Sequence, residues 1–144
     1  MKHINCECYI CKFGMKAAKE FERKAIEKYG FYIHFVPGDC ACPNHINIHT
    51  HGIAEVFGHM DLQICLPLTE GQALPILHNA VNMIKEGEVF EPGRKYSGIA
   101  ENYNIEFIEA IETNRRVLRM LLPNKHGNYA GVIYAAQKSL LHHK

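Results

Sequence analysis

The 144-residue chain contains no tryptophan, no long apolar run and almost no net charge. A membrane-spanning helix needs about 20 consecutive apolar residues, and the sequence offers no such run. The formal charge of +1 gives no overall field that would attract nucleic acid or an anionic membrane. Residues 1–8 lack the apolar segment of a secretory signal. These features predict a cytoplasmic protein whose partner is a protein or a small molecule, with homo-oligomerisation left open.

The chain length and composition are those of one globular domain. Hydrophobic residues make up 47% of the sequence and charged residues 22%. A chain of this size buries roughly two-thirds of its unfolded surface on folding. No internal repeat or linker divides it. We therefore expect a Cys-rich N-terminal arm over residues 1–14 and a single domain over residues 15–144.

The hydrophobic pattern predicts an α+β fold. Residues 15–29 carry apolar side chains at spacings of three and four, which is typical of a helix, and Gly30 ends the pattern. Thr69 and Gln72 form a capping box before a second helix that extends to residue 86. A short helix is expected over residues 132–142. Strands are expected at 31–36, 44–51, 59–66 and 103–110, with 117–122 as a strand or a helix end. We expect a mostly antiparallel sheet with helices packed on one face.

The most informative stretch is residues 44–52, which is rich in histidine. In a strand, alternate side chains share a face, so His45, Asn47, His49 and His51 point to one side and the intervening residues to the core. His49 and His51 lie about 7 Å apart at the backbone, close enough to bind one ion, whereas His45 is too far along the strand to join them. Such a pair favours zinc or a similar divalent ion. The alternative is that these histidines only form hydrogen bonds across a solvated face.

Candidate catalytic residues follow on the next expected strand. His59 and Asp61 share a parity there and would face the histidine pair, while Glu55 lies between the two strands. This arrangement predicts a metal-dependent hydrolase with His49, His51 and His59 as ligands and Asp61 or Glu55 as the base. A Cys/His nucleophile built from Cys40 or Cys42 fits the spacing but has no local signature. An interaction module without metal remains a further alternative.

The cysteines suggest a separate zinc site. Cys6, Cys8 and Cys11 form a C-x-C-x-x-C cluster. With one residue from Cys40, Cys42 or His45, the cluster would complete a structural tetrahedral zinc site. Free thiols, or disulfides formed on oxidation, are the alternative. Cys65, flanked by Ile64 and Leu66, is expected to be a small buried residue.

The order of several motifs resembles a known family. The motifs are Gly30 to His34, Asn47 to Ile53, Phe57 to Leu62, Gly87 with Phe90 and Gly93, and Leu122 to Asn124 with Gly127. Together they are similar to the bacterial family known as domain of unknown function 4262, over about residues 30–127. The resemblance implies a single α+β domain and carries no established activity. The Cys-rich arm is not part of the family pattern.

Overall fold

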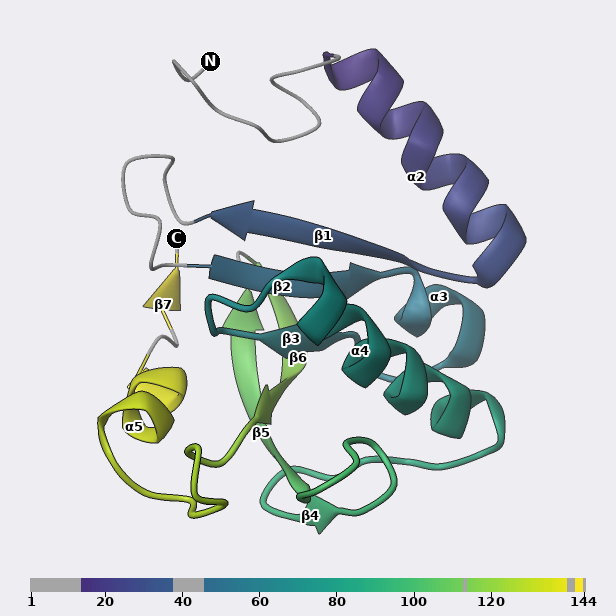
Figure 1. The fold of residues 1–144 in the computed structure, drawn as a ribbon. Helices are drawn as coiled ribbons and strands as arrows, with labels where there is room; N and C mark the ends of the chain where they lie inside the picture. Colours follow the sequence, from purple (N-terminus) through teal and green to yellow (C-terminus); the bar gives the residue numbers. More distant parts are fainter. Residues whose placement is uncertain (1–13, 38–45, 113, 140–141, 144) are drawn as a thin grey trace.

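The computed structural model describes residues 14–37, 46–112, 114–139 and 142–143. They form one α+β domain around a seven-stranded mixed sheet (Figure 1). The elements in chain order are α2 (Met15–Tyr29), β1 (Tyr32–Pro37), β2 (Ile46–His51), α3 (Ile53–Phe57), β3 (Leu62–Ile64), α4 (Glu70–Lys85), β4 (Lys95–Tyr96), β5 (Ile105–Glu112), β6 (Arg115–Leu121), α5 (Val132–Ser139) and β7 (His142–His143).

The sheet is mostly antiparallel, as the sequence predicted. Its strand order is β1-β2-β3-β6-β5-β4, with β7 paired to β5. The neighbouring strands β1 and β2 are antiparallel, as are β2 and β3, whereas β3 runs parallel to β6. A parallel pair needs a long crossover, and the segment between β3 and β6, which includes α4 and the β4–β5 hairpin, provides it.

One face of the sheet forms the main core beneath α4. Apolar side chains from all the central strands point to this face, and α4 covers them with its buried residues Ala73, Ile76, Leu77, Ala80, Val81 and Ile84. The predicted capping box is present: the Thr69 hydroxyl accepts from the Gln72 amide N–H, and the Gln72 side chain accepts from the Thr69 N–H. The sequence predicted helices packed on one face of the sheet, and α4 packs in this way.

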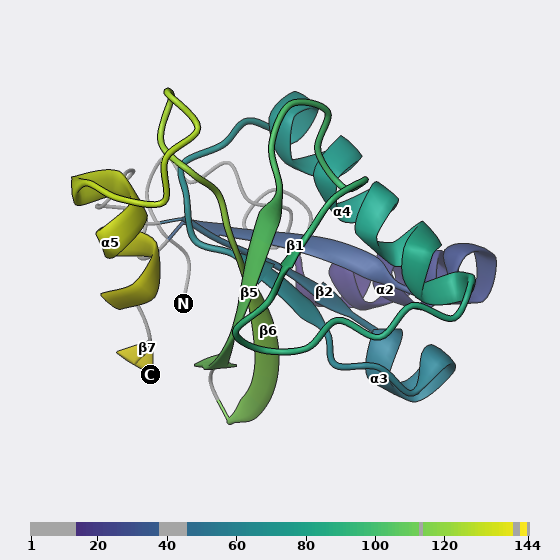
Figure 2. The same ribbon diagram turned by 90° about the horizontal axis from the view of Figure 1, so that it is seen from below.

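The short helix α5 packs against the opposite face. Arg119 of β6 donates from Nη1 to the backbone oxygen of Gln137 in α5 at 2.8 Å. Figure 2 shows α4 and α5 on different sides of β5 and β6. The other long helix, α2, flanks β1 at the end of the strand order (Figure 1).

Three segments differ from the sequence prediction. The helix expected over residues 132–142 is α5, Val132–Ser139, and His142 belongs to β7. Residues 53–57, expected as a connection, form the helix α3 between Gly52 and Gly58. The strand expected over residues 59–66 is confined to Leu62–Ile64. Gly52 has a φ of +107°, and a Cβ there would lie 2.9 Å from the oxygen of Gly30. Glycine is therefore required where β2 ends against the turn between α2 and β1.

Candidate metal centre

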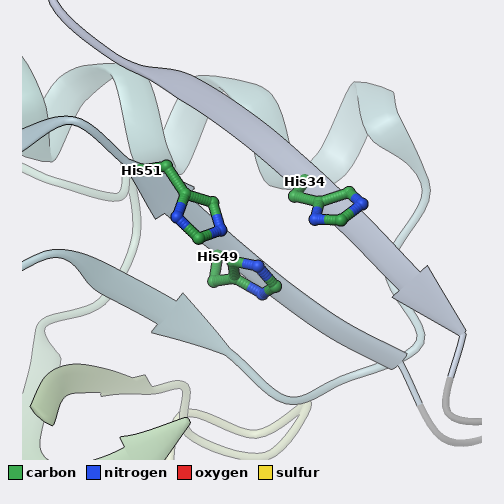
Figure 3. Close-up of side chains that lie close together, drawn as sticks. All are labelled: His34, His49 and His51. Atoms are coloured by element: carbon green, nitrogen blue, oxygen red, sulfur yellow. The ribbon is translucent and has the colours of Figure 1, made fainter. Parts of the chain in front are cut away.

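Three histidines from two neighbouring strands converge on one point. His34 of β1 lies opposite His49 of β2 in the antiparallel register, and His51 is two residues further along β2. One ring nitrogen from each of the three side chains lies within 4.8 Å of the other two. Figure 3 shows all three side chains projecting from the same side of the two strands. The predicted pair at His49 and His51 therefore gains a third member, His34.

Alternation along β2 separates this cluster from the core. Ile48 and Thr50 are fully buried on the opposite face, as predicted, and Ile48 belongs to the main core with α4. The histidine face is less solvated than the sequence suggested, because His49 is only 2% exposed. The His51 ring stacks on Tyr32, with centroids 4.9 Å apart. The cluster is thus part of the packed structure and has restricted ring positions.

Burial keeps these imidazoles neutral. Desolvation lowers the pKa of His49 to about 3. Desolvation and the nearby Arg115 guanidinium lower the pKa of His51 to about 4. Desolvation also lowers the pKa of His34. A neutral imidazole has a free lone pair, so at pH 7 all three rings are in the form that binds a metal.

A chain of buried amides fixes the tautomer of His49. A guanidinium can only donate, so Arg119 Nε donates to Oε1 of Gln63 at 2.8 Å, which leaves the Gln63 Nε2 to donate to Oδ1 of Asn47 at 2.9 Å. The same Asn47 oxygen lies 3.0 Å from Nδ1 of His49, and because that oxygen accepts, Nδ1 carries the proton. The lone pair of His49 is therefore on Nε2. Such outer hydrogen bonds orient the ligands of many metal sites.

Two charged residues border the cluster. The Glu112 carboxylate oxygen Oε1 lies 4.0 Å from His49 Nε2, and Glu112 is 8% exposed. Arg115 holds this carboxylate through a 2.8 Å contact from its Nε. Thus a carboxylate lies near the unprotonated nitrogen of His49, on the opposite side of the ring from Asn47.

His59 and Asp61 do not face the histidine pair, contrary to expectation. The His59 Nδ1 lies 2.8 Å from the backbone oxygen of Met60, and its Nε2 accepts from the Phe90 N–H at 3.1 Å. Asp61 Oδ1 accepts from the Thr50 hydroxyl at 2.7 Å and from the Ile53 N–H at 3.1 Å. Both side chains are thus used to hold backbone segments together.

Asp61 instead anchors the start of α3. Its second oxygen accepts from the Ala54 N–H at 3.4 Å and lies 3.3 Å from Nη1 of Arg115. Burial raises the pKa of this carboxyl, although Thr50 and Arg115 act in the opposite direction. Glu55, the other expected base, is exposed on α3. The three expected catalytic residues are therefore not brought together with His49 and His51.

The predicted cysteine site lies outside the described residues. This applies to Cys6, Cys8, Cys11, Cys40, Cys42 and His45. Cys65 is described: it is a free, buried thiol, as expected from its neighbours, and burial raises its pKa to about 11.

Sequence reasoning missed several parts of the centre, among them His34 and Arg119. Side chains alternate between the two faces of a strand, so His34 shares a face with Tyr32 in β1. The pairing of β1 with β2 places His49 and His51 on that same face. Arg119 lies inside an apolar run from Val117 to Leu122, and its complete burial was not expected. An arginine within a buried strand was the available signal, because such a side chain needs polar partners.

The fold and the centre define a small α+β domain with a three-histidine cluster on a sheet face. Comparison with protein families matches residues 25–131 to the family described as a domain of unknown function, DUF4262. The match spans well over half of the chain, and the chain belongs to this family. Searches of curated proteins and of solved structures gave no match. Among the described residues, no helix is long and apolar enough to cross a membrane.

Proposed function

We propose that this protein binds one divalent transition-metal ion, most simply zinc, through His34, His49 and His51. The observation that carries the proposal is the convergence of three ring nitrogens within 4.8 Å. Zinc–imidazole bonds of about 2.0–2.1 Å place the ligand nitrogens of a tetrahedral site about 3.3 Å apart. Small rotations of the imidazole rings would bring the three nitrogens from within 4.8 Å of one another to this spacing. Imidazole ligands suit zinc, copper, nickel and iron.

The surroundings of His49 support the proposal. Its proton is held on Nδ1 by Asn47, so the lone pair that a metal ion would use is on Nε2. A buried chain of Gln63 and Arg119 maintains that arrangement. A solvated row of histidines would need no such buried support.

Zinc titration tests the proposal. The five cysteines at 6, 8, 11, 40 and 42 are first replaced by serine, so that thiolates cannot contribute. Competition with a chromophoric chelator is then measured in this background, with His51→Ala as the test variant and the exposed His126→Ala as the matched control. We expect one zinc per chain, retained in His126→Ala and weakened at least tenfold in His51→Ala. Equal affinity in the two variants would refute the centre.

The cysteine cluster remains a second proposed zinc site with a structural role. Cys6, Cys8 and Cys11 with a fourth ligand from Cys40, Cys42 or His45 have the chemistry of a closed site. A second zinc equivalent in the unmodified chain, lost in the Cys6→Ser/Cys8→Ser/Cys11→Ser variant, would support it. The same metal content in both chains would refute it.

A metal-dependent hydrolase is the second candidate function. Three histidine ligands leave one position open on a tetrahedral ion, and such an ion supplies a Lewis acid. The specific observation is Glu112, whose carboxylate lies 4.0 Å from His49 Nε2 and would serve as the base in place of Asp61 or Glu55. Hydrolysis of an activated ester by the zinc-loaded chain, lost in both His51→Ala and Glu112→Gln, would support this candidate. Activity that persists in Glu112→Gln would remove Glu112 as the base.

A further inference from the structure

A cavity of about 560 Å³ lies between α2, β1 and the start of α4. This volume is in the range of small-molecule sites, roughly 300–1,000 Å³. Its lining residues come from α2, β1 and α4, and α2 lies alongside β1, the first strand of the sheet (Figure 1). It shares only His34 with the three-histidine cluster.

The wall of the cavity is rich in aromatic rings. Five aromatic residues line it: Phe21, Tyr29, Phe31, Tyr32 and Phe35. Aromatic faces attract cations through the negative ring quadrupole. One ring already shows this behaviour, since the Lys28 ammonium lies 5.1 Å from the centroid of Tyr29. Of the other rings, Tyr32 stacks on His51 and Phe31 meets the edge of the His78 ring, so the wall of the cavity is itself packed.

The charged groups at the cavity are acidic. Glu22 of α2 and Glu70 of α4 belong to the lining, and no lysine or arginine is among the described lining residues. Two carboxylates beside aromatic rings disfavour an anionic ligand and complement a positive one.

We infer that this cavity binds an organic ammonium ion, an amine or quaternary ammonium with a small apolar body. The apolar part of the ligand would displace water from the aromatic wall, and its positive charge would lie between ring faces and the two carboxylates. The site adjoins the proposed metal centre: it shares His34 with that centre, and its Tyr32 ring stacks on His51.

Three probes of one shape test the inference. Choline, 3,3-dimethylbutan-1-ol and 3,3-dimethylbutanoate carry similar branched groups and differ in charge. Each is titrated into the full isotope-labelled chain, and amide shifts of Tyr32 and Phe35 report binding at the cavity. We expect choline to bind at least about tenfold more tightly than the alcohol, consistent with the strength of cation–π contacts.

Two variants test how much the carboxylates contribute to the affinity for choline. In Glu22→Gln/Glu70→Gln the affinity for choline should fall several-fold towards that of the alcohol, with the part of the preference due to the rings retained, whereas Glu88→Gln, an exposed glutamate outside the cavity, should leave the affinity unchanged. An alcohol that binds as tightly as choline would show a simple apolar cavity and overturn the inference. Preferred binding of the butanoate, choline shifts confined to other residues, or no binding of any probe would overturn it as well.

Discussion

The strand β2 carries two polar centres on its two faces, and they differ in how completely their groups are paired. On one face Thr50 and Asp61 form a buried network with α3 and Arg115. On the other face, His34 and His51 have no hydrogen-bond partner for their ring nitrogens among the described residues, and only His49 is held by Asn47. A saturated polar centre stabilises a fold, whereas neutral rings with free lone pairs are available to a ligand. Sequence spacing placed Asp61 in one centre with His49 and His51. In the folded sheet, Asp61 lies with Thr50 on one face and the histidines lie on the other.

The largest expected effect comes from breaking the Asp61 centre. Asp61→Ala leaves Arg115, the Thr50 hydroxyl and the first amides of α3 without their buried acceptor. Removal of one partner from such a buried pair costs roughly 3 to 5 kcal/mol. We expect the free energy of unfolding, measured by urea denaturation, to fall by this amount. A change below about 1 kcal/mol, typical of a surface residue, would contradict the structural role.

The second largest expected effect is the pH dependence of the free energy of unfolding, which comes from the histidine centre. In the folded chain the pKa values of His49 and His51 are about 3 and about 4, whereas in the unfolded chain both are near 6.5. The unfolded chain therefore binds more protons between these values, and the free energy of unfolding falls as the pH drops from about 6.5 towards 4. We expect a loss on the order of 3 kcal/mol between pH 7 and pH 5 in metal-free protein.

The control for this pH effect is the variant His49→Gln/His51→Gln. It should remove the larger part of the dependence between pH 7 and pH 5 and leave the part due to His34, whose pKa burial also lowers. An unchanged pH dependence in the variant would assign the effect to other groups.

Breaking the hydrogen bond to His49 should weaken metal binding without unfolding the chain. Asn47→Ala removes the acceptor that fixes the proton on Nδ1. Loss of such outer contacts typically reduces metal affinity 10- to 100-fold. We expect a decrease of this size in the chelator competition, with the exposed Asn82→Ala as the matched control. Equal affinity in both variants would show that the tautomer is not set by Asn47.

The smallest expected effect is at Glu55. Its side chain is exposed on α3 and has no place in either centre. Glu55→Ala should change the free energy of unfolding by less than about 0.5 kcal/mol and leave the zinc affinity unchanged. A loss of zinc affinity would restore the role that sequence spacing suggested for this residue.

Much of the fold could be predicted because its signals are local. The helix over Met15–Tyr29 follows from apolar spacing, and α4 begins at the predicted capping box. The alternation along β2 placed Ile48 and Thr50 in the core. Each of these inferences depends on residues within a few positions of one another.

The parts that could not be predicted depend on distant residues. His34 joins the cluster only through the register of β1 on β2, and the support of His49 reaches Arg119 of β6. Asp61 was expected within a strand that begins at residue 59. Its carboxylate binds the amides at the start of α3, and β3 begins only at Leu62.

The most direct test compares His34 with His59 in the chain that lacks the five cysteines. Sequence spacing selected His59 as the third ligand, and the strand pairing selects His34. We expect His34→Ala to lose the bound zinc, measured by elemental analysis after dialysis, and a folded His59→Gln variant to keep it. Zinc retained in His34→Ala and lost in folded His59→Gln would contradict the three-histidine centre.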